Sequence, residues 1–339
     1  MSIERFKWPV VGHKSIVSYL QNSIINNKVA HAYLFFGPAG MGKTVVAESF
    51  VTSLVCARVN HADGIVPCGE CDCCRQIANR LHPDMIWINR ELDEKTGKFK
   101  KNISIEQIRE LKNKLSLHPF LDSYKAVVIH EAQYLSPEAA NALLKTLEEP
   151  TPKTVIILLV DNIAWMPQTI VSRCQVLKFL PVRQAEISEK LKQLGADKKS
   201  ADKFASLAYG RPGIAIDYLS TPDLFQDYQQ KIKDFLTLTQ ADLPQKFKFI
   251  SSAFSYSDVN EVLPTLNIWL KTVRDLALIK SQNPGLVANV QVNSDLEKIA
   301  SRYSVIKLSQ IIKEIIAAKR YLSANVNPRL ILENLILNF

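Results

Sequence analysis

The feature that most constrains this sequence is a glycine-rich loop at residues 37–44, which has the spacing G-x-x-x-x-G-K-[ST]. An apolar run at residues 33–36 precedes the loop, and a stretch with helical spacing follows it. A strand, a glycine loop and a helix in this order are typical of a phosphate-binding loop, whose backbone N–H groups turn inward on phosphates. The alternative is a plain glycine turn before a helix. In a nucleotide site the lysine would reach phosphate oxygens and the threonine would hold Mg²⁺. The predicted nucleotide-binding residues are Gly37, Gly40, Gly42, Lys43 and Thr44.

Short apolar runs alternate with helical segments through the first half of the chain. Residues 126–129 and 154–160 have the length and composition of buried strands. Residues 136–138, Ser-Pro-Glu, begin a helix, because serine caps a helix and proline suits its first position. Buried strands that alternate with helices predict a parallel sheet covered on both faces. We therefore expect an α/β domain over residues 1–179.

After residue 181 the apolar pattern is helical only. A small helical unit is expected first, and it closes on glycine and proline at residues 209–213. An acidic stretch with a proline at residues 220–223 marks the next boundary. Beyond it, apolar residues at helical spacing form two stripes. The sequence therefore predicts a helical unit over residues 180–220 and an all-α domain over residues 221–339.

The charge balance and the apolar runs bear on the protein's surroundings. The chain has 42 basic and 33 acidic residues, and a basic protein of this size often works near nucleic acid. Its most continuous apolar stretch, residues 155–160, is far shorter than the ~20 residues of a membrane-spanning helix. The N-terminus mixes both charges and lacks the apolar segment of a signal peptide. We expect a cytoplasmic protein with no membrane partner and with reduced thiols.

Four of the six cysteines have the spacing of metal ligands. Cys68, Cys71 and Cys74 follow one another at intervals of three, and Cys56 lies upstream. Four thiolates suit a closed tetrahedral zinc site. Cys73 is interpreted as a bystander, because its use would break the even spacing. The alternative is a reduced cluster without metal. The sequence predicts structural Zn²⁺ in a module inserted at about residues 56–74.

Hydrolysis of a bound nucleotide needs a second element, an acidic pair at the end of a neighbouring strand. The candidate segment is residues 127–131, in which His130 occupies the metal-organising position and Glu131 could orient the attacking water. Imidazole is a poor ligand for Mg²⁺, which prefers oxygen. The alternative is a structural histidine at a strand end. Either way, the sequence does not predict an efficient ATPase.

Taken together, these residues resemble clamp-loader subunits of bacterial DNA polymerase III, which belong to the AAA+ class. The resemblance covers nearly the whole chain, and its most specific segments are residues 141–150 and 172–174. It implies an α/β P-loop (AAA+) domain with a parallel sheet, a small helical lid and an all-α C-terminal collar. The implied divisions are residues 1–179, 180–220 and 221–339.

The resemblance also implies a role within a larger assembly. Arg173, in the segment Ser-Arg-Cys, would be an arginine finger that reaches the γ-phosphate of ATP on a neighbouring subunit. The assembly is a hetero-oligomer of about five subunits, with gamma/tau and delta subunits, and it loads a sliding clamp on primed DNA. Its members include a rigid stator and ATP-hydrolysing motors of the gamma/tau type. His130 favours the stator. The polar sensor residue that the family has after the third strand would here be only Asp161 or Asn162, which also favours the stator. The same holds for Arg211, which lies near the sensor of the lid but not where a motor subunit has its arginine.

Lysines gather in two short stretches of the sequence. The functional interpretation is contact with the phosphate backbone of primed DNA, and the alternative is a solvated charged face. For any one cluster the solvated face is the simpler reading. The residues are Lys95, Lys98, Lys100 and Lys101, and Lys190, Lys192, Lys198 and Lys199.

Overall fold

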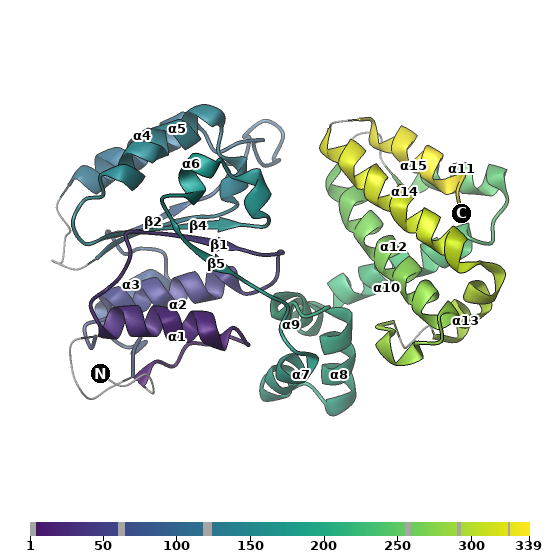
Figure 1. Cartoon of the computed structure of the whole chain (residues 1–339), viewed down its shortest axis with the longest axis horizontal. Helices are drawn as coiled ribbons and strands as arrows, with labels where there is room; N and C mark the ends of the chain where they lie inside the picture. Colours follow the sequence, from purple (N-terminus) through teal and green to yellow (C-terminus); the bar gives the residue numbers. More distant parts are fainter. Residues whose placement is uncertain (1–4, 60–64, 118–123, 255–258, 290–292, 325) are drawn as a thin grey trace. The chain divides into compact units, whose positions relative to one another are not determined.

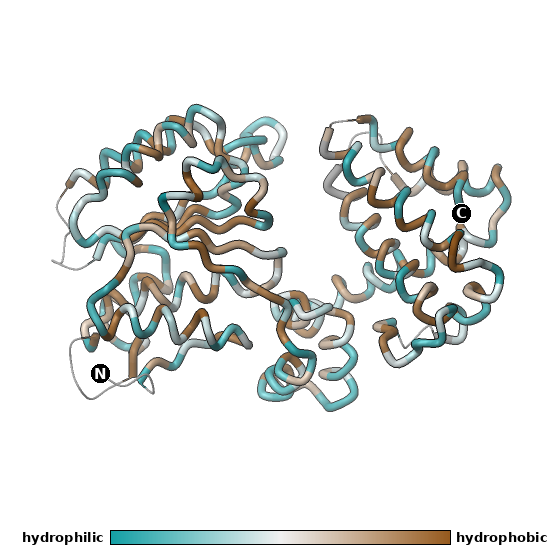
Figure 2. Tube along the Cα trace, in the orientation of Figure 1, coloured by the Kyte–Doolittle hydropathy of each residue, from teal (hydrophilic) through white to brown (hydrophobic). Residues whose placement is uncertain are grey.

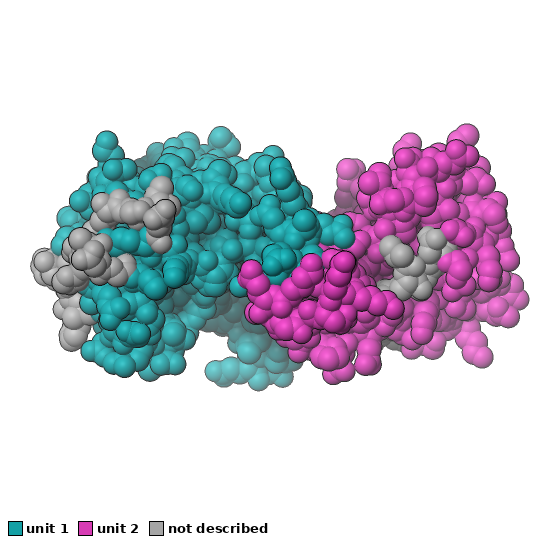
Figure 3. Space-filling view, turned by 90° about the horizontal axis from the view of Figure 1, so that it is seen from below, with its two compact units in different colours: residues 1–190, 210–214 teal, residues 191–209, 215–339 magenta. Residues whose placement is uncertain are grey.

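The computed structural model describes residues 5–59, 65–117, 124–254, 259–289, 293–324 and 326–339. The chain divides into two compact units, which Figure 3 shows in different colours. The first unit comprises residues 1–190 and 210–214, and the second comprises residues 191–209 and 215–339. Within the described ranges, no helix has both the length and the apolar content that a membrane crossing needs.

The first unit is built on a five-stranded sheet with the strand order β2-β3-β4-β1-β5 (Figure 1). All the strand pairings in this sheet are parallel. Every residue of β4 is buried, as expected for a parallel strand that is covered on both faces. The predicted parallel α/β architecture is therefore confirmed. The strands are β1 (Ala32–Phe36), β2 (Met85–Ile88), β3 (Lys125–Ile129), β4 (Thr154–Val160) and β5 (Gln175–Lys178).

Helices cover both faces of this sheet, because successive side chains of a strand point to opposite sides. Tyr33 and Phe35 pack with α1, α2 and α3, whereas Ala32 and Leu34 pack with α4, α5 and α6. Figure 2 shows the strands as a mostly hydrophobic layer. The helices are α1 (Lys14–Ile25), α2 (Lys43–Val55), α3 (Asp72–Ala78), α4 (Ile105–Ser116), α5 (Pro137–Glu148) and α6 (Gln168–Val171), with short 3₁₀ turns η2 (Ala132–Tyr134) and η3 (Ile163–Trp165).

The start of α5 follows the pattern read from the sequence. The Ser136 side chain accepts a hydrogen bond from the Ala139 N–H at 3.1 Å, and Pro137 is the first helical residue. The first turn of a helix has backbone N–H groups without a partner inside the helix. Ser136 accepts a hydrogen bond from one of them, and Pro137 has no N–H to satisfy. The helix therefore begins where the sequence predicted.

The C-terminal region is helical, as predicted. The indole of Trp269 is fully buried, with ring centroids 5.7 Å from Phe235 and 5.7 Å from Phe339. These rings join residues of two helices and the C-terminal residue into one core. The helices are α7 (Gln184–Gln193), α8 (Lys198–Leu207), α9 (Pro212–Ser220), α10 (Pro222–Leu238), α11 (Leu243–Ala253), α12 (Val259–Lys280), α13 (Asn293–Arg302), α14 (Val305–Ser323) and α15 (Pro328–Ile336), with the 3₁₀ turn η4 (Pro284–Leu286).

The predicted division at residues 179 and 220 stays a prediction. Helices α7 and α9 both begin in the first unit and end in the second. The range 180–220 is therefore shared between the two units.

A buried polar network lies within the helical unit. The Asp275 carboxylate is fully buried, and its Oδ2 accepts hydrogen bonds from the Asn289 side chain at 2.8 Å and from the Asn289 N–H at 3.0 Å. The Ala288 N–H also donates to this oxygen, at 3.2 Å. The Tyr228 hydroxyl donates to Asn289 Oδ1 at 2.7 Å. The network therefore ties α10 and α12 to the segment that follows η4.

Candidate nucleotide and metal sites

The phosphate loop leads from β1 into α2 and has the conformation its glycines require. Gly40 and Gly42 have φ angles of +81° and +89°, a region in which side chains cause strain. A Cβ added to Gly40 would lie 2.7 Å from Cγ1 of Ile214. The Gly213 N–H donates to the Gly40 carbonyl at 2.8 Å. The first turn of α9 therefore holds the loop in place, a contact that the sequence did not predict.

A pocket of about 300 Å³ lies over the loop. All the predicted nucleotide-binding residues except Gly37 line it, together with the polar groups expected from the neighbouring strands. Gly37 contributes its carbonyl, which accepts a hydrogen bond from Lys43 Nζ. The pocket therefore joins the loop to the carboxyl ends of β3 and β4. Its lining is Ala39, Gly40, Met41, Gly42, Lys43, Thr44, His130, Glu131, Leu159, Asp161 and Gly213.

The Lys43 side chain is folded into the loop and is 9% exposed. Its Nζ donates to the Pro38 carbonyl at 3.2 Å and to Oδ1 of Asp161 at 2.8 Å. Of the two sensor candidates, Asp161 is the one that lines the pocket. The Asn162 side chain instead accepts a hydrogen bond from the Ala164 N–H at 3.0 Å and caps η3. The ammonium therefore lies where a phosphate-binding lysine is needed, with a carboxylate in place of phosphate.

Glu131 is engaged by an arginine that the sequence analysis missed. Arg90 places Nη2 2.8 Å and Nε 3.0 Å from Oε2 of Glu131. The same guanidinium lies over the Tyr134 ring, 4.1 Å from its centroid. A charge-assisted pair of this kind is strong and directional. Oε2 of Glu131 is therefore engaged by Arg90, and an attacking water would have to compete with this ion pair for that oxygen.

His130 lies against the aromatic ring of Trp87, with centroids 5.7 Å apart. The Arg80 guanidinium lies over the Trp87 ring, 3.5 Å from its centroid. Burial lowers the pKa of His130, the Arg80 charge lowers it further, and Glu131 opposes both effects. His130 is therefore neutral at pH 7, because its ordinary pKa is already about 6.5.

These residues do not fit a Mg²⁺ site of the kind that phosphate loops use. The position that should offer a carboxylate holds an imidazole. The two carboxylates that do line the pocket, Glu131 and Asp161, each pair with a cation. Mg²⁺ requires hard oxygen ligands. The loop fits a phosphate group and Thr44 could offer its hydroxyl to a metal, but both carboxylates among the lining residues are already paired with cations.

The cysteine cluster has the geometry of a four-thiolate site. The Sγ atoms of Cys56, Cys68, Cys71 and Cys74 all lie within 4.8 Å of one another, and those of Cys68 and Cys74 are 3.9 Å apart. Zn–S bonds of ~2.3 Å in a tetrahedron place sulfur atoms ~3.8 Å apart. Cys73 lies outside the cluster, as expected. The four cysteines could therefore hold a structural metal such as zinc.

The environment of these thiols favours a thiolate at Cys56. A hydrogen bond from the Cys74 thiol lowers the pKa of Cys56 to about 5, and the same bond raises the pKa of Cys74. Backbone N–H groups also approach sulfur, from Cys68 to Cys56 Sγ at 3.5 Å and from Cys71 to Cys68 Sγ at 3.4 Å. Such donors stabilise thiolates, which are the form that binds metal.

Arg173 lies on the surface of the first unit, between α6 and β5. Its Nη2 is 2.6 Å from Oε1 of Glu148, and its Nη1 donates to the Thr169 carbonyl at 2.9 Å. The side chain is 36% exposed and is not among the residues that line the phosphate-loop pocket. Arg211, directly before α9, does not line this pocket either. Within its own chain, Arg173 therefore contacts α5 and α6 instead of the bound-nucleotide position.

The first lysine cluster belongs to the connection between β2 and α4. Leu92 and Phe99 form an antiparallel bridge in this connection, and Lys100 pairs with Glu91 at 2.7 Å. Both apolar side chains of the bridge are exposed. The contact of either cluster with DNA stays a prediction.

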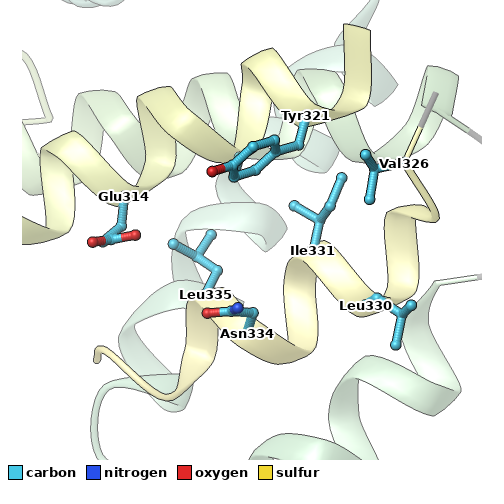
Figure 4. A pocket seen from close by; sticks show the side chains of 8 residues that line it. Glu314, Tyr321, Val326, Leu330, Ile331, Asn334 and Leu335 are labelled. Carbon is cyan, nitrogen blue, oxygen red and sulfur yellow. The ribbon is translucent and has the colours of Figure 1, made fainter. Parts of the chain in front are cut away.

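A second hollow, of about 420 Å³, lies between α14 and α15 in the helical unit (Figure 4). Tyr321 of α14 and Ile331 of α15 point into the space between the helices. Apolar side chains dominate its lining, with Glu314 and Asn334 as polar members. It has no cluster of cations or thiols, so it offers neither a phosphate site nor a metal site.

Comparison with known proteins places the chain among replication proteins. A family model described as DNA polymerase III, delta subunit, matches residues 12–183, and one for the C-terminal part of that subunit matches residues 225–339. The chain is 26% identical over 324 residues to DNA polymerase III subunit delta' of Bacillus subtilis. The aligned region covers 95% of this chain and 94% of that protein. It is 33% identical over 280 residues to subunit tau of the same organism, covering 81% of this chain and 47% of that protein.

A further relative is subunit delta' of Pseudomonas aeruginosa, which is 39% identical over 145 residues, 43% of this chain and 42% of that protein. The chain therefore spans most of the Bacillus delta' subunit but about half the length of the tau subunit. The two family models fall on the α/β region and on the helical region described above. The chain belongs to the delta' family of DNA polymerase III clamp-loader subunits, which is related to the gamma and tau subunits.

Proposed function

We propose that this chain is the stator of a clamp loader, and that it completes the ATP site of a neighbouring subunit with Arg173. The observation that carries the proposal is the position of Arg173 on the surface, paired with Glu148 and apart from its own phosphate loop. A planar cation held by a single exposed ion pair can exchange that partner for a phosphate. The arginine therefore suits a site that a second subunit provides.

The proposed partners follow from membership of the family. The chain would assemble with gamma/tau and delta subunits and act, in the cytoplasm, on a sliding clamp and primed DNA. The helical C-terminal region would serve as the collar that joins the subunits. The four-cysteine cluster would hold Zn²⁺ in a purely structural role, because four protein thiolates leave no open coordination position.

The alternative is a gamma/tau-type motor that hydrolyses ATP itself. The intact phosphate loop and the similarity to the tau subunit favour it. One contact and one residue identity count against it, since Glu131 is paired with Arg90 and His130 stands at the metal-organising position. An efficient hydrolytic site needs a carboxylate in place of His130 to organise Mg²⁺, and a Glu131 carboxylate that is free to orient water.

The test is ATP hydrolysis by the purified full-length chain, alone and with gamma/tau and delta subunits. We expect no hydrolysis above background from the chain alone. We expect its addition to raise the DNA- and clamp-stimulated hydrolysis of the other subunits. A rate from the isolated chain that matches an isolated motor subunit would contradict the stator proposal and support the motor.

A further inference from the structure

We propose that the phosphate-loop pocket binds the triphosphate of ATP without a divalent cation. This inference rests on nucleotide binding by the loop. It goes beyond the stator role, which depends on Arg173 and not on this pocket. Three features of the pocket carry it: the commitment of its carboxylates, the position of Lys43 and the identity of residue 130.

The first feature is that both carboxylates in the pocket already have a cationic partner. Oε2 of Glu131 receives two N–H groups of Arg90, and Oδ1 of Asp161 receives Lys43 Nζ. A divalent cation bound to Oε2 of Glu131 would lie within a few ångströms of the Arg90 guanidinium. Like charges at that separation repel strongly in a partly buried pocket. The pocket therefore opposes Mg²⁺ at Glu131, and it offers Asp161 to a metal only after a phosphate has displaced that carboxylate from Lys43.

The second feature is the supply of positive charge for the phosphates. Lys43 Nζ is held inside the loop by two main-chain carbonyls and by Asp161. The N-terminus of α2, a helix of 13 residues, begins at Lys43 and points its free N–H groups at the pocket. Together they provide phosphate contacts that do not require a metal. The ammonium needs only to exchange Asp161 for a phosphate oxygen.

The third feature is His130, whose ring lines the pocket and is fixed by Trp87. A neutral imidazole carries one N–H donor, which a carboxylate lacks. At this position a carboxylate would repel phosphate unless a metal ion lay between them, whereas an imidazole can contact phosphate directly. The charged groups that face His130 are Arg80 from the α3 side and Glu131 beside it, and Arg90 neutralises the latter. The imidazole at position 130 therefore has two effects: it takes away a carboxylate ligand for Mg²⁺, and it takes away the charge repulsion that Mg²⁺ would otherwise have to screen.

The experiment is calorimetric titration of sodium ATP into the full-length chain, with MgCl₂ and in buffer freed of divalent ions by chelating resin. EDTA is avoided because it would also draw metal from the cysteine cluster. Because Mg²⁺ in solution withdraws free ATP as MgATP, we expect binding in the divalent-free buffer to be at least as tight as binding with MgCl₂. The matched variant His130→Asp restores the carboxylate and should bind at least about tenfold more tightly with Mg²⁺ than without it.

The other outcomes are equally informative. Binding of ATP by the wild-type chain only in the presence of Mg²⁺ would overturn the inference and leave nucleotide binding in place. If the Mg²⁺ dependence then disappeared in Asp161→Asn, Asp161 would be the metal ligand. Failure to bind ATP in either buffer would overturn both this inference and nucleotide binding by the loop. The stator role would stand in each case, because its test is Arg173.

Discussion

Lys43 Nζ lies 2.8 Å from Oδ1 of Asp161, so the phosphate-binding ammonium and the residue that follows β4 form an ion pair. The lysine is nearly buried, whereas the Asp161 side chain is 37% exposed. A nucleotide must therefore compete with this carboxylate for the ammonium. The free energy of the Lys43–Asp161 ion pair is therefore subtracted from the free energy of phosphate binding.

Substitution of Asp161 by Asn should strengthen ATP binding, because the ammonium then loses a charged competitor of the phosphate. An ion pair with a solvent-accessible partner contributes up to about 1 kcal/mol, so we expect the dissociation constant to fall by up to about fivefold. Calorimetric titration of the full-length chain measures this change. The control is Asp295→Asn, an exposed carboxylate of the helical unit, which should change nothing. Weaker binding by Asp161→Asn would contradict the competition described here.

Loss of a cluster cysteine should remove the metal and destabilise the first unit. We expect Cys71→Ser to reduce bound zinc from about one per chain to well below that and to lower the melting temperature. The matched control is Cys73→Ser, since Cys73 lies two residues along the chain, in the helix that follows Cys71, but outside the cluster. Elemental analysis and thermal denaturation report the two effects. Equal zinc contents in the two variants would show that the four thiols are not the ligands.

His130 should make the stability of the chain depend on pH. Its pKa is lowered in the folded chain by burial and by Arg80, whereas in the unfolded chain it is about 6.5. As pH falls through that value, the unfolded chain binds a proton that the folded chain does not. The free energy of unfolding therefore decreases toward acid pH, by at most about 1.4 kcal/mol per pH unit for each such histidine.

The comparison of the wild-type chain with His130→Gln isolates this contribution. Protonation of the cysteine cluster at low pH affects both proteins equally. Between about pH 7 and pH 5 the wild type should lose stability more steeply than the variant in urea denaturation. Parallel curves would mean that His130 titrates in the folded chain as it does in the unfolded one.

The parts of the fold that the sequence predicted depend on local patterns. The phosphate loop, the strands beside it and the start of α5 each follow from a few neighbouring residues. The four-cysteine cluster was also predictable, because its spacing alone limits how the thiols can meet. These patterns involve residues that are close together in the sequence, so they do not depend on how distant segments pack.

The missed features depend on contacts between distant segments. Arg90 meets Glu131 because β2 lies beside β3, and the carboxyl ends of parallel strands share one edge of the sheet. The strand order, once known, would have indicated this pair. Gly213 meets Gly40 because the chain returns to the loop after the helices α7 and α8. Neither contact has a signature in the residues that surround it, so sequence patterns alone could not have revealed them.

The helical unit should depend strongly on Asp275. Its replacement by Ala would leave the N–H groups of Ala288 and Asn289 buried without their acceptor. We expect a loss of about 3 kcal/mol in the free energy of unfolding, measured by urea denaturation. The control Asp295→Ala, at an exposed carboxylate, should lie within about 0.5 kcal/mol of the wild type. A loss of similar size in both variants would mean that the buried network contributes no more than a surface charge.

The central claim is that Arg173 acts on a neighbouring subunit's ATP. The most direct test is DNA- and clamp-stimulated ATP hydrolysis by the reconstituted loader, with the wild-type chain, Arg173→Ala or Glu148→Ala. Removal of an arginine finger costs about 10³-fold or more at the site it serves. We therefore predict that Arg173→Ala abolishes hydrolysis at that site while the loader still assembles. Glu148→Ala, which removes the carboxylate partner of Arg173 but leaves its hydrogen bond to the Thr169 carbonyl, should retain hydrolysis. Unchanged hydrolysis with Arg173→Ala, or an equal loss with Glu148→Ala, would contradict the account.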